Sequence, residues 1–124
     1  MAKHNETGKW GEELATQYLK KKGYIIMERD WHSGKRDIDI IAKTADLSTI
    51  VFVEVKTRTS AEVTLPEDAV TRKKIFYLGQ SANNYVKMRN IEEELRFDIV
   101  SIVGTSNENA VIEHIEDAFN PLLA

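Results

Sequence analysis

Three charged side chains interrupt two of the most apolar stretches of the sequence. Asp39 lies between two isoleucines, and Glu54 and Lys56 flank Val55 in a run of β-forming residues. Burial normally selects against charged side chains that have no partner. Two carboxylates suit a hard divalent cation such as Mg²⁺, and an adjacent ammonium group can orient water and offset phosphate charge. The residue types therefore suit metal-assisted hydrolysis of a phosphodiester.

The elements that must bring these side chains together are two strands, over residues 36–42 and 50–58. A short polar loop joins them, which predicts an antiparallel hairpin. Because side chains alternate along a strand, Glu54 and Lys56 share a face about 7 Å apart, and the pairing can bring Asp39 opposite that face. The alternative is an exposed Glu54–Lys56 ion pair worth less than about 1 kcal/mol, with Asp39 an ordinary exposed acid.

A first helix, predicted over residues 6–22, adds a fourth candidate. Glu12 falls at the border of its apolar stripe, from which it can reach over a sheet edge toward the hairpin. The alternative is a solvated helix acid. The stripe comprises Trp10, Leu14, Ala15, Tyr18 and Leu19.

The remaining pattern predicts a strand over residues 24–29, a second helix from Pro66 to about Met88, and strands over 97–103 and 110–115. The element order is α-β-β-β-α-β-β, which indicates a mixed central sheet flanked by helices in one α/β domain over residues 1–124. Neither repeats nor a linker-like segment interrupt it.

Composition narrows the classes of function. The chain has 124 residues and no cysteine, which excludes disulfides, thiolate zinc sites and cysteine nucleophiles. Any metal at the candidate site must therefore bind to oxygen ligands. No apolar run approaches the length of a membrane span, so we expect a cytoplasmic protein.

Charge is unevenly distributed along the chain. The net charge is −3, which argues against a nucleic-acid partner when taken alone. Residues 1–89, however, carry 16 Lys and Arg against 12 Asp and Glu, whereas residues 90–124 carry one Arg against eight acids. The candidate site thus lies in the basic part of the chain, which keeps nucleic acid open as a partner.

The string Asp39…Glu54-Val55-Lys56 resembles the PD-(D/E)XK signature of the restriction-endonuclease-like superfamily. The resemblance narrows to the YraN-like family of uncharacterised bacterial predicted endonucleases, which are similar to archaeal Holliday-junction resolvases. The matching segments follow in order along the chain, at residues 8–15, 22–24, 37–42, 51–58, 69–71, 96–100 and 118–119.

The resemblance implies a restriction-endonuclease-like αβββαβ core. It implies Asp39 and Glu54 as metal ligands, with Mg²⁺ as the cofactor and Mn²⁺ as an alternative, and Glu12 as the additional helix acid of the resolvase-like branch. The implied catalytic set is Glu12, Asp39, Glu54 and Lys56, with Arg58 and Lys74 close by to contact phosphate.

The second strand departs from the family pattern. Arg36-Asp37 stands where the family usually has Gly-Glu, and Ile38 replaces the proline of the signature. Asp37 and Asp39 share a strand face, so either could bind the metal; we favour Asp39.

The function implied is a metal-dependent endonuclease, with branched, Holliday-junction-like DNA as the favoured substrate and a homodimer as the expected assembly. The alternative is a non-cleaving nucleic-acid-binding or protein-interaction module that retains the fold.

The sequence also predicts the surroundings of two histidines and one tryptophan. His32, on a turn, is expected to be solvated rather than a ligand of metal or phosphate. His114 is expected to have no partner, and Trp10 is expected to pack in the core rather than to stack on bases.

Overall fold

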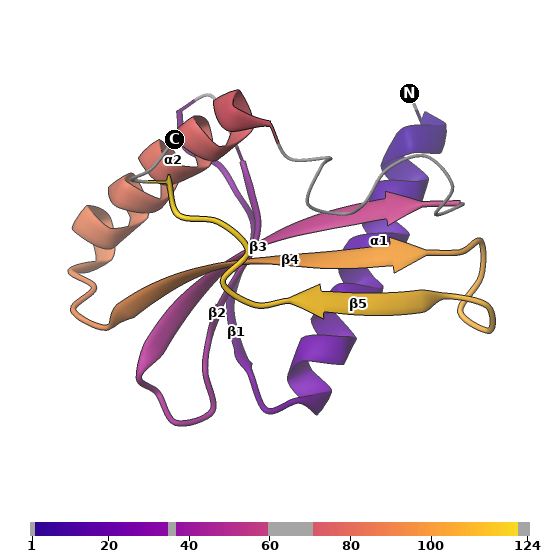
Figure 1. Cartoon of the computed structure of the whole chain (residues 1–124), viewed down its shortest axis with the longest axis horizontal. Helices are drawn as coiled ribbons and strands as arrows, with labels where there is room; N and C mark the ends of the chain where they lie inside the picture. Colours follow the sequence, from indigo (N-terminus) through magenta and orange to yellow (C-terminus); the bar gives the residue numbers. More distant parts are fainter. Residues whose placement is uncertain (1, 35–36, 60–70, 122–124) are drawn as a thin grey trace.

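The computed structural model describes residues 2–34, 37–59 and 71–121, with side chains from residue 8 onward (Figure 1). The predicted order of elements is confirmed. The elements are α1 (Ala2–Lys21), β1 (Ile25–Trp31), β2 (Ile38–Lys43), β3 (Thr49–Arg58), α2 (Arg72–Arg89), β4 (Glu94–Val103) and β5 (Val111–Ile115).

The five strands form one mixed sheet in the order β1-β2-β3-β4-β5. The β2–β3 pair is the antiparallel hairpin that the sequence predicts, with Ile40 opposite Val53. β3 and β4 are parallel, so the chain must cross over between them, and α2 lies in this connection. The other neighbouring pairs are antiparallel.

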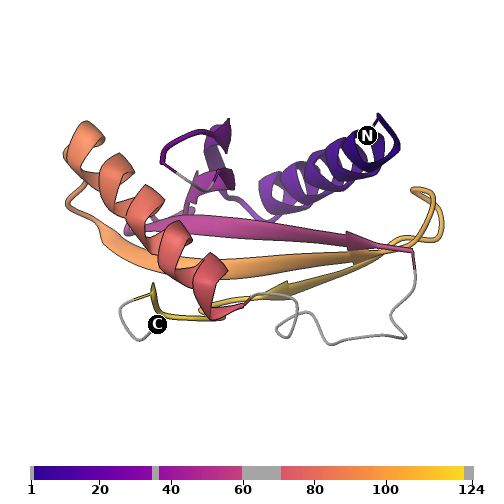
Figure 2. The ribbon, with the colours of Figure 1, turned by 90° about the horizontal axis from the view of Figure 1, so that it is seen from above.

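The two helices pack on opposite faces of the sheet. Ala15 and Leu19 of α1 belong to a buried cluster with Val51 and Val53 of β3, while the alternate residue Phe52 packs with α2. Both views show α1 and α2 lying toward opposite ends of the sheet (Figures 1 and 2). This places β3 between two apolar layers, which is why its sequence is apolar on both faces.

Trp10 packs against the α1 cluster, as expected, and its Nε1 donates a hydrogen bond to Asn107. The contact fixes α1 to the turn between β4 and β5. None of the described helices is long and apolar enough to span a membrane.

The predicted starts of both helices were wrong: α1 begins at Ala2 and not at residue 6, and the second helix begins later than Pro66. α2 begins at Arg72, with the Thr71 hydroxyl capping it by accepting a hydrogen bond from the Lys74 amide at 3.3 Å. Pro66 is the start that the sequence predicts, because proline suits a first helical turn, but threonine satisfies an exposed amide of the helix end and proline does not. Pro66 itself lies outside the described residues.

The end of α1 was predicted correctly. Gly23 adopts a φ of 95°, a left-handed conformation that favours glycine. Its amide donates to the Lys20 carbonyl and the Tyr24 amide donates to the Leu19 carbonyl, which is the Schellman pattern of a helix end. The turn delivers the chain directly into β1.

Candidate metal centre

Asp39 and Glu54 lie where the β2–β3 ladder ends. The paired register runs from Lys43 opposite Ile50 to Ile40 opposite Val53. Beyond that last pair, a side-chain hydrogen bond joins the two strands: the Asp39 Oδ2 accepts from the Val55 amide at 2.8 Å. Asp39 is half-buried. The hairpin therefore brings the Asp39 carboxylate against the strand that carries Glu54.

Glu54 is almost completely buried, with 3% of its side chain exposed, and Lys56 is 21% exposed. The Lys56 Nζ lies 3.6 Å from the Glu54 Oε2, so the two side chains share a face as the alternation predicts. The exposed ion pair that was the alternative interpretation is contradicted by this burial. Removing two charges from water costs several kcal/mol per ion before their attraction is counted.

Burial and charges on two strands act on Glu12 of α1. The pKa of its carboxyl is raised, first because half-burial disfavours the charge, and further because Asp30 and Glu54 repel it, while Arg29 partly offsets both. The charge of Glu54 is the smallest of these influences. Helix α1 packs on the Val51 and Val53 face of β3, whereas Glu54 shares the other face with Phe52, so a role of Glu12 beside the hairpin acids stays a prediction.

The positions of Arg58 and Lys74 relative to Glu54 follow from the elements that carry them. Arg58 lies on the same face of β3 as Glu54, about 13 Å further along the strand. Lys74 lies in the first turn of α2, one turn before Leu78, which packs on the same face of the sheet as Phe52. Both cations therefore lie on elements that border the Glu54 face, at its periphery.

A second acidic group lies at the ends of β1 and β2. Asp30, His32 and Asp37 are exposed, and one ligand atom from each lies within 4.8 Å of the others. His32 Nδ1 lies 2.8 Å from Asp37 Oδ1, and this hydrogen bond, with the charges of both acids, raises the pKa of His32. His32 is exposed, as expected. Asp30 was not among the predicted site residues, although its spacing of two residues from His32 is a signal in the sequence.

The same contacts distinguish Asp37 from Asp39. Asp37 is exposed and pairs with His32, whereas Asp39 is half-buried and bonded to β3. Of the two, Asp39 is the one that the structure places beside Glu54.

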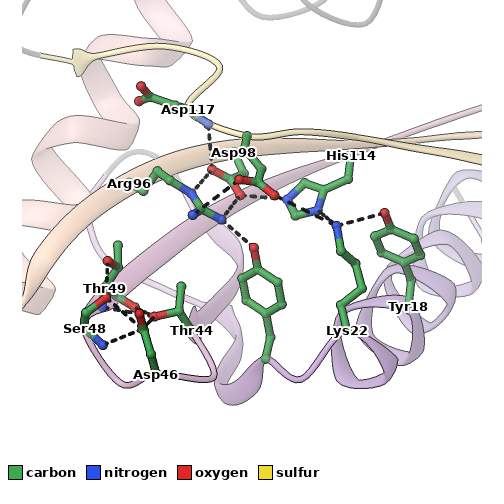
Figure 3. Close-up of polar contacts among 12 residues, drawn as sticks. Tyr18, Lys22, Thr44, Asp46, Ser48, Thr49, Arg96, Asp98, His114 and Asp117 are labelled. Carbon is green, nitrogen blue, oxygen red and sulfur yellow. Dashed lines mark hydrogen bonds and ion pairs between the residues drawn. The ribbon is translucent and has the colours of Figure 1, made fainter.

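His114 corrects the sequence analysis, which expected no partner for it. The ring is 2% exposed, its Nε2 lies 2.7 Å from Asp98 Oδ2, and its Nδ1 lies 3.2 Å from the Lys22 Nζ (Figure 3). Since an ammonium group can only donate, Nδ1 accepts from Lys22 and Nε2–H donates to Asp98. The expectation failed because the register between β4 and β5 and the docking of α1 are not visible in the sequence.

A cavity of about 560 Å³ lies between α2, β4 and the segment after β5. Its lining is largely aromatic and apolar, including Phe76, Phe97 and Phe119, and contains none of Glu12, Asp39 and Glu54. The candidate metal centre is therefore separate from this cavity.

A family model described as "Uncharacterised protein family UPF0102" matches residues 11–102. The chain belongs to the UPF0102 family. The matched range contains Glu12, Asp39, Glu54 and Lys56. The UPF0102 protein of Phocaeicola vulgatus is 46% identical over 121 residues and is covered over 98% of both chains. That of Flavobacterium psychrophilum is 44% identical over 119 residues, or 96% of this chain and 98% of the relative.

The resemblance to the YraN-like family is thereby confirmed. Among solved structures, this UPF0102 chain is distantly similar to Pyrococcus furiosus SfsA in complex with Ca²⁺, with 10% identity and a TM-score of 0.37. The match covers 91% of this chain and 63% of the SfsA chain.

Proposed function

We propose that this UPF0102 protein is a divalent-metal-dependent endonuclease that hydrolyses DNA phosphodiester bonds, with branched DNA as the favoured substrate. One observation carries the proposal: the buried Glu54 carboxylate lies 3.6 Å from Lys56 on a strand to which Asp39 is hydrogen-bonded. Two carboxylates from paired strands and a lysine on the same face are the groups that metal-assisted phosphodiester hydrolysis uses.

The donor set fits Mg²⁺ or Mn²⁺. Mg²⁺ is commonly held by one or two carboxylates together with water, and Asp39 and Glu54 supply two carboxylates. The pKa of Glu12 is raised first by burial, then by repulsion from Asp30 and to a smaller degree from Glu54, so a nearby cation would favour its charged form. When bound, the cation would polarise the phosphodiester and make the attacking water more acidic.

We assign the remaining roles in binding and catalysis to side chains of the protein. Lys56 is positioned to orient the attacking water and to offset charge that develops on the phosphate. Glu12 adds a carboxylate from the helix side. Arg58 and Lys74, at the periphery of the same face, are proposed to contact the DNA backbone, whose binding is dominated by such cations. Two copies of the chain would supply one such site for each strand of a junction.

The test is a cleavage assay with labelled junction, flap, duplex and single-stranded DNA in Mg²⁺ or Mn²⁺. We expect cleavage by the wild type, greatest on the junction, and its loss in Glu54→Gln and Lys56→Ala. Glu113→Gln is the matched control, because Glu113 is an exposed glutamate on β5. Activity that survives both substitutions would remove the mechanism, and salt-dependent binding without cleavage would favour the non-cleaving module.

A further inference from the structure

The first half of β4 is an open edge of the sheet within the described part of the chain. All of β4 pairs with β3, but β5 pairs only with residues 99–103, so residues 94–98 have one neighbouring strand. The segment after β5 bonds to this edge through the Ala118 amide, which donates to the Phe97 carbonyl at 2.7 Å. That segment then turns toward α2 (Figure 1). An edge of this kind presents unpaired N–H and C=O groups.

Leu95 is the residue whose backbone is available to a further strand. The Glu94 amide donates to the Ser48 carbonyl on the β3 side, whereas the Phe97 carbonyl points to the other side, toward Ala118. Because backbone groups point to alternate sides along a strand, both groups of Leu95 point away from β3, like those of Phe97. Among the described residues, none forms a backbone hydrogen bond with Leu95 on that side. An added strand can therefore exchange two hydrogen bonds with Leu95.

The cavity of about 560 Å³ lies beside this edge. Its volume falls within the range of roughly 300–1,000 Å³ that is typical of ligand pockets. Leu95 and Phe97 line it from β4, Phe76 lines it from α2, and Phe119 lines it from the segment after β5. Two of these large apolar side chains reach solvent, since Phe76 is 49% and Leu95 is 44% exposed. A side chain of an added strand that points to the α2 face thus enters apolar surroundings.

Exposed acids surround the same edge. Glu92, Glu94 and Asp117 are all exposed, and none of them forms an ion pair with another residue that the structure describes. Asp117 lines the cavity, whereas Glu94 points to the opposite face of the sheet from Leu95, because side chains alternate along a strand. A strand added beside Leu95 therefore meets one carboxylate beside the cavity and another on the opposite face.

The cations of this region do not balance those acids. Lys43 pairs with Glu93 at 3.0 Å, and Arg96 pairs with Asp98 at 2.9 Å. Lys87, near the end of α2, is exposed, so three exposed acids stand against one exposed cation. This balance favours a basic partner over DNA. It also disfavours a second copy of the chain, because a two-fold contact brings the same acidic surface against itself.

We propose that the open edge of β4 at Leu95 is a docking site for an extended basic segment of a partner protein. The segment adds as a short strand, places an apolar side chain in the cavity and pairs a neighbouring arginine or lysine with Glu94. Backbone hydrogen bonds supply affinity and the alternating side chains supply specificity, as in other cases of strand addition. The site does not include Asp39 or Glu54 and does not depend on the proposed metal centre.

The first experiment uses a capped pentapeptide with a central phenylalanine, an arginine on each side of it and a threonine at each end. This symmetric pattern fits either strand direction. NMR follows hydrogen exchange of the Leu95 amide in the wild type, with and without the peptide. We expect exchange to slow by about tenfold or more at saturating peptide, because the amide becomes hydrogen-bonded. An unchanged amide with peptide bound would overturn strand addition, and no binding at millimolar peptide would overturn the site.

Variants then test each contact by calorimetry with the same peptide. Leu95→Pro removes the outward amide, a change that an edge strand tolerates, and should abolish binding, whereas Leu95→Ala keeps the amide and should retain most of the affinity. Equal losses in these two variants would contradict a role of the backbone. Glu94→Lys should weaken binding about fivefold at low salt, the scale of one exposed ion pair, and Glu113→Lys on β5 is the matched control. Equal affinities in the two lysine variants would remove the basic neighbour from the proposal.

Changes to the probe separate this partner from other occupants. Replacing the central phenylalanine by alanine should weaken binding about tenfold, and replacing both arginines by glutamates should abolish it; a failure of either change to weaken binding would overturn the proposal. If Leu95→Pro does not fold, these peptides and the hydrogen exchange of the wild type decide. Competition by a single-stranded oligonucleotide would assign the edge to nucleic acid. A dimer in sedimentation that Leu95→Ala or Glu94→Lys dissociates would assign it to a second copy, and either result would overturn the proposal.

Discussion

Two buried carboxylates lie on neighbouring strands of the sheet, and they differ in the groups that surround them. Glu54 of β3 lies opposite Ile99 of the parallel strand β4, and the preceding pair is Val53 and Asp98. Because side chains alternate, Glu54 and Asp98 point to opposite faces of the sheet. Their side chains are 3% and 0% exposed. Burial is thus the same, and the difference lies in what surrounds each acid.

Asp98 is saturated with donors. Arg96 binds both of its carboxylate oxygens at 2.9 Å, His114 binds at 2.7 Å, and the Asp117 amide donates at 3.0 Å (Figure 3). Burial raises the pKa of Asp98, but these hydrogen bonds outweigh it and leave the pKa below its ordinary value. Such a carboxylate is complete without a ligand, and it fastens β5 and the segment after it to β4.

Glu54 lies among other acids. The Asp39 carboxylate is hydrogen-bonded to the Val55 amide on the same strand as Glu54, and the Lys56 ammonium group lies 3.6 Å from the Glu54 carboxylate. After burial and Asp30, repulsion from Glu54 also contributes to the raised pKa of Glu12. The lesson is that burial of a charge does not identify a functional site; the sign of the remaining local charge does.

The largest expected effect is on catalysis. Glu54→Gln should lower cleavage of junction DNA on the order of 10³-fold, because it removes a proposed metal ligand at the reacting group. Asp98→Asn, assayed at a temperature where it is folded, should keep activity within a few-fold of the wild type. Equal losses of cleavage activity in the two variants would contradict the assignment of Glu54 to catalysis and of Asp98 to structure.

The next largest effect is on stability, and here Asp98 is expected to matter more than Glu54. Asp98→Asn should lower the free energy of unfolding by about 3–5 kcal/mol, the cost of breaking a buried, hydrogen-bonded charge pair. Urea denaturation without metal measures it, with Glu54→Gln as the comparison. We expect a smaller loss for Glu54→Gln, since it also relieves repulsion of Glu12. A larger loss for Glu54→Gln would reverse the assignment of structural and functional acids.

The pH dependence of stability should have opposite signs at the two carboxyls, measured with a chelator present. The lowered pKa of Asp98 gives stability that is present above its ordinary value of 3.8 and is lost as the pH falls below it. The raised pKa of Glu12 gives stability that is present below its ordinary value of 4.5 and is lost as the pH rises through the raised value.

Variants isolate each contribution. Asp98→Asn should flatten the loss of stability on the acid side, and Glu12→Gln should remove the loss above pH 4.5. If both variants change the curve in the same direction, the two acids do not differ in the way described.

The smallest expected effect concerns the exposed group Asp30, His32 and Asp37. His32→Ala should leave Mn²⁺ affinity and DNA cleavage unchanged, because His32 is exposed and pairs with Asp30 and Asp37, not with Asp39 or Glu54. Isothermal calorimetry and the junction assay measure both. A loss of Mn²⁺ binding in this variant would move the metal centre to the exposed group.

The sequence predicted those parts of the molecule that depend on local pattern. The Glu54–Lys56 face follows from strand alternation, and the hairpin follows from two β-rich runs with a short loop. Glu12 could be found because helical phase places it beside the apolar stripe.

What the sequence could not predict depends on contacts distant along the chain. The Asp98–His114 bond needs the register of β5 on β4, and the Lys22–His114 bond joins residues that lie 92 positions apart. Neither strand carries a pattern that fixes this register, because both apolar and charged residues alternate irregularly there. The open edge at Leu95 likewise depends on how far β5 extends along β4, which no local signal specifies.

The most direct test of the central claim is the effect of Mn²⁺ on the unfolding free energy of the wild type and Glu54→Gln. A ligand that binds only the folded state at 100 times its dissociation constant raises that free energy by about 2.7 kcal/mol. We predict this gain for the wild type and for Asp98→Asn, and its absence in Glu54→Gln. A gain of equal size in Glu54→Gln, or none in the wild type, would contradict a metal centre at Asp39 and Glu54.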